Sequence, residues 1–243
     1  MAFHYSPKTV TDKLMLALDA GNPTSYPGSG TTWYDLSGNN YHFTLVNSPT
    51  FGNHKNTPGF TFDKVDDYAR YLGPIQQNFG SECSFQIVVS SIGGGNGFGG
   101  CSRLMATGAS TTSGQDYQEY FCFASCDVYN FGIWYNYNNT GLGGIYPTSP
   151  LRTASDDYKV VVYSWSAAAN SIKIYVNGVL ETTNTFTATV FNYALVDRLV
   201  IGANNGFGEN SYVRVNSVLM YNKQLSATEV QQNYNALKAR FSL

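Results

Sequence analysis

The stretch SIKIYVNGVL, residues 171–180, carries the clearest structural signal in the chain. Its apolar residues Ile172, Ile174 and Val176 alternate with more polar positions, which is the period of a strand with one buried face. The Asn-Gly pair at 177–178 then predicts a two-residue turn, because both turn positions require a positive φ. We therefore expect a β-hairpin with the three apolar residues facing a core.

Strand patterns continue on both sides of this hairpin. YKVVVYSW at 158–165 is apolar on both faces, as a central strand covered on two sides would be. LMLALD at 14–19 would place Leu14, Leu16 and Leu18 inward. Similar runs, separated by Gly- and Asn-rich turns, are FTL (43–45), GFTF (59–62), YARYL (68–72), SFQIVVS (84–90), QEYFCFA (118–124), VYNFGIWY (128–135), RLVIG (198–202) and YVRVNSVLMY (212–221). Together they predict an all-β fold, an antiparallel sandwich.

A single helix is expected at the C-terminal end. Ser226 followed by Glu229 forms the capping-box pattern that starts helices. Val230, Tyr234 and Leu237 then recur at helical spacing and form a narrow apolar stripe. The helix should lie on the sandwich through this stripe.

The composition limits the domain plan and the classes of partner. No long linker divides the 243 residues, so we expect one domain over 13–243 and an N-terminal arm over 1–12. The first residues lack the apolar segment of a signal peptide, and no run reaches the ~20 apolar residues of a membrane span. The net charge is −2 and no basic patch is visible, so neither nucleic acid nor a membrane is an expected partner.

The four cysteines fit no zinc or redox motif. Cys122 and Cys126 are too far apart on one strand to bond to each other. Two alternatives stay open for Cys83, Cys101, Cys122 and Cys126: all are free thiols, or at least one disulfide forms. Cys101 with Cys122 or Cys126 is the first pair to examine.

Four stretches also follow one another in a familiar order. They are LMLALDAGNPTSYPGSGTTWYDLSGNNYHFTL (14–45), GFTFDKVDDYARY (59–71), DYKVVVYSWSAAANSIKIYVNGVL (157–180) and VNSVLMYNKQLSATEVQQNYNAL (215–237). Together they resemble the concanavalin A-like, laminin-G-type lectin and glucanase domains. The first stretch is similar to the versions carried by bacteriophage virion proteins, especially those of phages that infect cyanobacteria and other aquatic bacteria. The resemblance implies a concanavalin A-like jelly roll of two curved antiparallel sheets.

The same resemblance implies a function. It points to a non-enzymatic structural protein of a phage virion, as a capsid decoration or a tail- or fibre-associated protein, with a lectin-like domain for host-surface glycans. Such a protein is made in the host cytoplasm, needs no signal peptide and contacts other virion proteins as a homo-oligomer or in many copies. The alternative is a free-standing carbohydrate-binding lectin or an inactive relative of the glucanases.

No catalytic residues are expected. Glucanases of this superfamily carry a Glu-x-Asp-x-Glu strand that pairs two carboxylates for glycoside cleavage. None of the glutamates has an aspartate two positions later; they are Glu82, Glu119, Glu181, Glu209 and Glu229. We therefore expect a protein that is not an enzyme.

Calcium is the one metal that the sequence suggests, and no other cofactor is expected. Asp63, Asp66 and Asp67 cluster in FDKVDDY, and calcium takes carboxylate oxygens from loops. The alternative is an ordinary turn in which aspartate side chains bond local amides.

The segment 131–147, FGIWYNYNNTGLGGIYP, is the candidate glycan site. Aromatic faces stack on sugar rings, and planar amides bond sugar hydroxyls. The candidate ligand-binding residues are Trp134, Tyr135, Asn136, Tyr137 and Asn138. The alternative is that Trp134 and its neighbours belong to the core or to a subunit contact.

Overall fold

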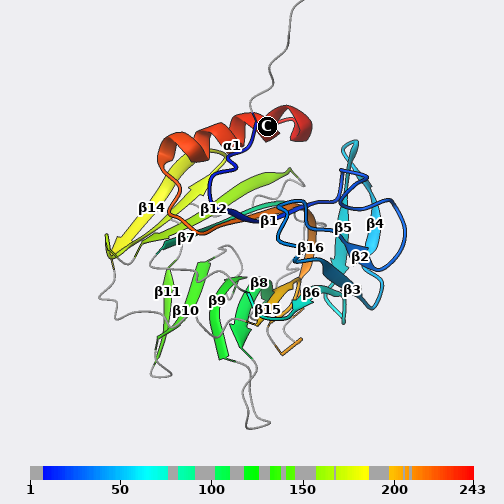
Figure 1. Cartoon of the computed structure of the whole chain (residues 1–243), viewed down its shortest axis with the longest axis horizontal. Coiled ribbons are helices and arrows are strands. Elements are labelled where there is room, and N and C mark those ends of the chain that lie inside the picture. Colours follow the sequence, from blue (N-terminus) through cyan, green and yellow to red (C-terminus); the bar gives the residue numbers. More distant parts are fainter. Residues whose placement is uncertain are drawn as a thin grey trace, which may run out of the picture.

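The structure, a computed structural model, describes residues 8–75, 82–90, 102–109, 118–125, 132–137, 141–145, 157–166, 168–185, 197–204, 206–207 and 210–243. Over these ranges the chain forms two antiparallel sheets packed face to face, with one C-terminal helix above the first sheet (Figure 1). The predicted all-β sandwich with a single short C-terminal helix is confirmed.

The first sheet has the strand order β14-β13-β12-β7-β16-β5-β4, and β1 pairs with β16. Its strands are β1 (Leu14–Asp19), β4 (Thr50–His54), β5 (Thr57–Asp63), β7 (Glu82–Ser90), β12 (Lys159–Ser166), β13 (Ser171–Val176), β14 (Val179–Thr185) and β16 (Tyr212–Tyr221). The second sheet has the order β11-β10-β9-β8-β15-β6-β3-β2. Its strands are β2 (Thr32–Trp33), β3 (Phe43–Val46), β6 (Tyr68–Leu72), β8 (Ser102–Ala109), β9 (Gln118–Ser125), β10 (Gly132–Tyr137), β11 (Gly141–Ile145) and β15 (Arg198–Ile201).

The hairpin β13–β14 has the predicted geometry. Asn177 and Gly178 both have positive φ, at 50° and 82°, as a tight turn between twisted strands requires. Ile172 and Ile174 are fully buried in the core between the sheets, and Val176 packs against it. The prediction from the Asn-Gly signal is therefore confirmed.

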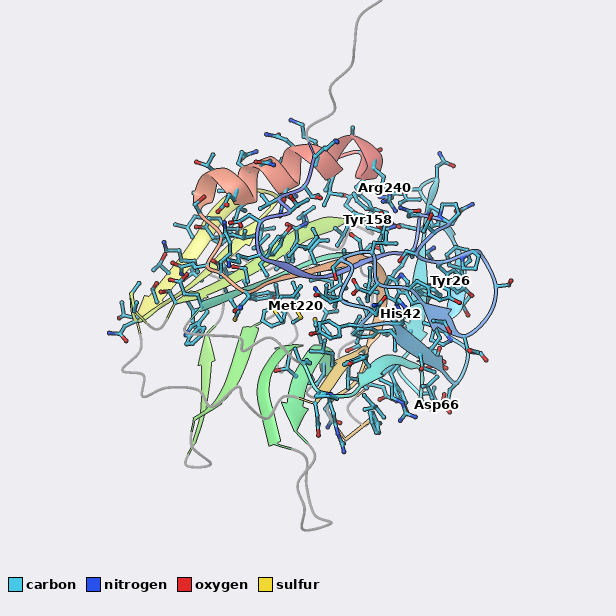
Figure 2. The ribbon with its side chains drawn as sticks, in the orientation of Figure 1. Tyr26, His42, Asp66, Tyr158, Met220 and Arg240 are labelled. Carbon is cyan, nitrogen blue, oxygen red and sulfur yellow. The ribbon has the colours of Figure 1, made fainter. Side chains whose placement is uncertain are left out.

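The first strand differs from its prediction at one residue. Leu16 and Leu18 lie in the core between the sheets together with Met220, which is labelled in Figure 2. Leu14 instead packs in the cluster on the helix side, because the pairing of β1 with β16 shifts register between Leu14 and Leu16. The expectation that all three leucines face one way was wrong, since a bulge moves the strand out of strict alternation.

The helix α1 (Ala227–Phe241) covers the outer face of the first sheet (Figure 1). Ser226 and Glu229 form the predicted capping box. Val230 and Phe241 are buried against the sheet, where Val160 and Val162 of β12 are also buried. The central strand β12 is thus covered on both sides, as its sequence predicted.

Residues 8–12 are docked on the domain. Val10 is buried in the helix-side cluster, its backbone N–H donates to Asn233 Oδ1 at 2.7 Å, and its carbonyl accepts from the Tyr221 hydroxyl at 3.1 Å. Asp12 pairs with Lys223 at 2.8 Å. The second half of the predicted arm is therefore fixed to β16 and α1, while residues 1–7 lie outside the described ranges.

The motif WYDLSGNNY near the start of the chain has a structural role. Asp35 is buried and its carboxylate accepts hydrogen bonds from the backbone N–H groups of Ala17, Ser37 and Tyr41 at 2.9 to 3.1 Å. The Ser37 hydroxyl donates to the same carboxylate at 2.7 Å. These bonds hold the connection between β2 and β3 against β1, so the motif stabilises the fold.

Only part of the cysteine prediction falls on described side chains. Cys83 is a buried free thiol, and burial, with a smaller contribution from Glu82, raises its pKa. Cys122 lies on β9, and Cys101 and Cys126 lie outside the described residues. The disulfide alternatives for these three stay predictions.

No helix among the described residues has both the length and the apolar composition needed to cross a membrane.

Candidate functional site

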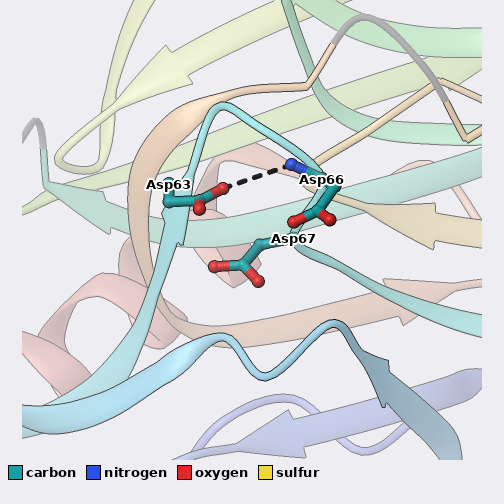
Figure 3. A group of neighbouring side chains, drawn as sticks. All are labelled: Asp63, Asp66 and Asp67. Carbon is teal, nitrogen blue, oxygen red and sulfur yellow. Dashed lines mark hydrogen bonds between the residues drawn. The ribbon is translucent and has the colours of Figure 1, made fainter.

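The turn between β5 and β6 gathers three carboxylates. β5 ends at Asp63, and the chain reverses through Lys64, whose φ is 68°. Asp63 Oδ1 accepts a hydrogen bond from the backbone N–H of Val65 at 2.8 Å and another from that of Asp66 at 3.3 Å (Figure 3). These bonds are the local capping that aspartate supplies in turns, and they fold the turn so that Asp66 and Asp67 come back towards Asp63.

The three carboxylates lie close enough to share an ion. One carboxylate oxygen from each of Asp63, Asp66 and Asp67 lies within 4.8 Å of the others. Asp63 and Asp66 are exposed, whereas Asp67 is only 4% exposed. Burial and the neighbouring Asp63 charge, with a smaller contribution from Asp66, raise the pKa of Asp67 to about 6, although a backbone hydrogen bond from Asp63 opposes the shift. The turn thus brings three carboxylates together at one end of β5.

An aromatic and cationic stack lies directly after this turn. The rings of Tyr68 and Phe207 stack with centroids 5.0 Å apart and an angle of 10° between planes. The guanidinium carbon of Arg70 lies 4.9 Å from the Phe207 centroid and 5.8 Å from that of Tyr68. Arg198 approaches Phe207 from the next strand at 5.8 Å. We call Tyr68, Arg70, Arg198 and Phe207 the Arg70 stack.

The stack stands on the outer face of the second sheet. Strand alternation sends Ala69 of β6 into the core between the sheets, and Tyr68 and Arg70 to the other side. There, Tyr68 and Phe207 pack over Val200 of β15 in a small separate cluster. No helix or strand of the described ranges covers this face, in contrast to the helix-covered first sheet (Figure 1).

Two asparagine side chains tie the surrounding loops to the carboxylate turn. Asn210, which follows the Phe207 loop, donates to the carbonyl of Val65 at 2.6 Å. Asn47, at the end of β3, donates to the carbonyl of Asp66 at 2.9 Å. The acidic turn and the Arg70 stack therefore form one connected surface at one end of the second sheet, where Asp66 is labelled in Figure 2.

The predicted glycan segment belongs to the same sheet. Trp134, Tyr135, Asn136 and Tyr137 lie on β10, and Asn138 lies outside the described residues. Backbone register pairs Trp134 with Cys122, which pairs with Ala106. The same cross-strand row continues through Val200 to Arg70. The glycan role of this segment stays a prediction, and the sequence patterns missed the Arg70 stack on the same sheet.

Glu82 and Glu229 both have structural partners. Glu82 accepts from the Ser166 hydroxyl at 3.0 Å and from the backbone N–H of Gln224 at 3.4 Å. Glu229 belongs to the capping box and pairs with Lys223 at 2.5 Å. Both carboxylates stabilise the region where α1 begins.

Comparison with known proteins agrees with this architecture. A family model described as the concanavalin A-like lectin/glucanases superfamily matches residues 102–231, more than half of the chain. No curated protein matches the chain. Among solved structures, the receptor-binding domain of botulinum neurotoxin type G superposes with a TM-score of 0.66 at 13% identity, over 92% of this chain and 51% of that one.

Two further solved structures extend the comparison. One is a structure of botulinum neurotoxin type C, whose cell entry depends on interaction with two ganglioside molecules. It superposes with a TM-score of 0.67 at 12% identity, over 94% of this chain and 52% of that one. The sialidase of Trypanosoma rangeli in complex with sialic acid gives 0.62 at 16% identity, over 93% and 33%. The chain thus spans about half of the toxin domains and about one third of the sialidase, and at these identities the likeness concerns the fold. With its two-sheet sandwich and a family match over more than half of its length, the chain belongs to the concanavalin A-like lectin/glucanase superfamily.

Proposed function

We propose that the protein is a non-enzymatic structural component of a bacteriophage virion whose lectin-like domain binds glycans on the host surface. It would stand on the capsid or on the tail or its fibres, in many copies or as a homo-oligomer, among other virion proteins. The virion part of this proposal rests on the resemblance of residues 14–45 to stretches of phage virion proteins. The glycan part has structural support.

The difference between the two outer faces carries the glycan proposal. One face is filled with apolar side chains and covered by α1. The other presents the Arg70 stack beside three carboxylates. Aromatic rings combined with a few convergent polar groups are typical of ligand sites. Botulinum neurotoxin type C, whose cell entry depends on gangliosides, and the Trypanosoma rangeli sialidase in complex with sialic acid give the fold a precedent for glycan recognition.

The carboxylate turn would hold calcium beside this surface. Calcium prefers six to eight oxygen ligands, and Asp63, Asp66 and Asp67 supply three carboxylates within 4.8 Å of one another. The raised pKa of Asp67 fits such a site, because a bound cation would offset both the burial of this carboxylate and the repulsion from Asp63 that raise its pKa. Bound calcium would rigidify the turn and neutralise its charge next to the Arg70 stack.

We do not propose that the aspartates of this turn act as the catalytic residues of a glycosidase. Retaining enzymes place a nucleophile and an acid across a substrate cleft. Here Asp63 Oδ1 already accepts two backbone hydrogen bonds of its own turn, and Asp67 is almost fully buried. Purified protein should therefore release no reducing sugar from algal or bacterial polysaccharides. Release that disappears in Asp63→Asn or Asp67→Asn would show that the protein is a hydrolase.

A binding assay tests the glycan proposal. Wild-type protein and Phe207→Ala are compared on a glycan array and on host cell surfaces, with calcium and with EDTA. We expect Phe207→Ala to lose at least tenfold in affinity, and the matched variant Leu72→Ala, on the same strand as Arg70 and half exposed, to bind as the wild type does. Trp134→Ala tests the predicted segment on β10 in the same way. Equal binding by all variants would exclude this face as the site.

Co-sedimentation with assembled particles tests the virion proposal and separates it from the alternative of a free-standing lectin or inactive glucanase relative. The arm should be tested by removing residues 1–7 alone, because removing 1–12 would also remove the buried Val10 and destabilise the domain. We expect particles to lose the protein when 1–7 are absent. Particles that never contain the protein would refute the virion role, and full occupancy without 1–7 would refute the anchoring role of the arm.

A further inference from the structure

Arg70 presents a charge that no directly paired carboxylate among the described residues neutralises. Its side chain is half-buried on the outer face of the second sheet, and its guanidinium lies against the rings of Phe207 and Tyr68. Within the described ranges it makes no hydrogen bond or ion pair. Arg198, by contrast, has a carboxylate neighbour, since Asp197 lies 3.6 Å from its Nε atom.

The aromatic rings hold this cation in place. Phe207 has φ of 65°, a left-handed conformation that is strained for a bulky residue. Its backbone N–H donates to the carbonyl of Asn204 at 2.9 Å, and the Asn204 side chain accepts from Gly206 at 2.9 Å. These bonds maintain the strained turn and place the Phe207 ring parallel to Tyr68. Strain of this kind is found preferentially where a side chain must be positioned for function.

Two guanidinium groups therefore lie around one aromatic ring. Register pairs Arg70 with Val200 and Leu72 with Arg198, so the two arginines are diagonal neighbours on adjacent strands. Both approach Phe207, at 4.9 Å and 5.8 Å. A planar guanidinium donates two parallel hydrogen bonds to a carboxylate, a geometry that ammonium groups lack. The Tyr68 ring is buried, but Phe207 is partly exposed and can contact the C–H groups of a sugar whose carboxylate pairs with the guanidinium.

We propose that the Arg70 stack selects an acidic glycan, one whose sugar carries a carboxylate that pairs with Arg70 while the ring lies against the aromatic groups. This inference rests on the proposed glycan-binding function and adds the class of ligand to it. The three aspartates of the adjacent turn would oppose an anion while they are charged. Calcium at that turn should therefore raise the affinity for the acidic glycan more than for a neutral one.

The test compares sugars that differ only in the carboxylate. Oligogalacturonate and its carboxyl-reduced neutral form are titrated into the full chain by calorimetry, with calcium and with EDTA, and a sulfated galactan oligosaccharide serves as a second anion. We expect the wild type to bind oligogalacturonate at least tenfold more tightly than the reduced form. Arg70→Gln should lose this preference and keep its affinity for the neutral sugar, and Arg70→Lys should retain part of the preference through charge alone.

Lys238→Gln is the matched control, because it removes the same charge from an exposed position on α1. It should behave as the wild type, and thermal melts should show that all variants are folded. Equal binding of both sugars by the wild type would overturn the acidic-glycan inference and leave glycan binding intact. Binding of neither sugar, nor of any glycan on the array, would instead refute the proposed function. A tenfold preference for the sulfated chain would overturn the carboxylate assignment.

Discussion

On the outer face of the first sheet, Val160, Val162 and Tyr175 are buried beneath α1, whereas on the outer face of the second sheet Arg70 and Leu72 reach the solvent. Both faces belong to antiparallel strands of one sandwich, and strand alternation alone would allow either of them to be polar. The helix determines the difference, because burial against α1 requires an apolar surface. A ligand site is therefore expected on the sheet that no described helix covers.

The strongest way to test this comparison is to place the same charge on each face. Val230 of α1 is fully buried against the first sheet, so Val230→Asp should cost at least ~3 kcal/mol of unfolding free energy through an unpaired buried charge. Leu72 on the second sheet is 50% exposed, and Leu72→Asp should change stability by no more than about 0.5 kcal/mol. Urea denaturation followed by tryptophan fluorescence measures both values. Equal losses would mean that something outside the described residues covers the second face.

The contact between the hairpin and the helix gives a smaller effect. Gly178 has φ of 82°, and a Cβ atom there would lie 2.9 Å from Gln231 Oε1 and 3.1 Å from a Tyr234 ring carbon. Gly178→Val should therefore cost more than ~1 kcal/mol, from left-handed strain and from the clash with α1. The neighbouring Val179 is exposed, so Val179→Thr should leave the melting temperature nearly unchanged. A normal melt for Gly178→Val would contradict the turn geometry.

The capping box tests how firmly the helix covers the first sheet. The Ser226 side chain accepts from the Glu229 backbone N–H at 3.3 Å, and Ser226→Ala should cost about 0.5–2 kcal/mol. Thr228→Ala, at an exposed position of the same turn, is the control and should be near neutral. If removal of 226–243 left stability unchanged but abolished incorporation into particles, the helix would be an assembly contact and the comparison of the two faces would fail.

Sequence patterns predicted the helix-covered half of the molecule better than the other. The hairpin, β12 and α1 combine strong periodicity with turn or cap signals, and each forms as expected. The edge strands β2, β4 (TFGNH) and β11 (GLGGI) and the interior strand β8 (SRLMATGA) were missed. They are short or contain Gly, Asn, Ala and Ser, which have little intrinsic strand preference, and pairing with neighbouring strands supplies their order.

The candidate site also has one part that the sequence predicted and one part that it missed. The three aspartates were predicted together because they are neighbours in one turn, and the structure places their carboxylates within reach of one ion. The Arg70 stack joins β6 to a distant loop, and no local pattern connects Arg70 with Phe207. Only the pairing of β6 with β15 brings them together. A phenylalanine flanked by glycines in NNGFGEN was the available signal, since an aromatic residue in such a turn-forming loop has no periodic reason to be there.

The smallest expected effect concerns the charge on the open face. The pKa of Asp67 is raised to about 6, above its usual value near 3.9, so the folded state binds this proton more tightly than the unfolded chain does. The charged carboxylate therefore destabilises the fold above pH 6, and this penalty disappears as the pH falls from about 6 to about 4.

Without calcium, Asp67→Asn should raise the melting temperature at pH 7 by roughly 2–4 °C and have little effect at pH 4. Calcium should raise the wild-type melting temperature at pH 7 more than that of the variant, and Asp66→Asn, at an exposed position, should gain less. An equal gain at both pH values would show that packing, and not charge, explains the effect.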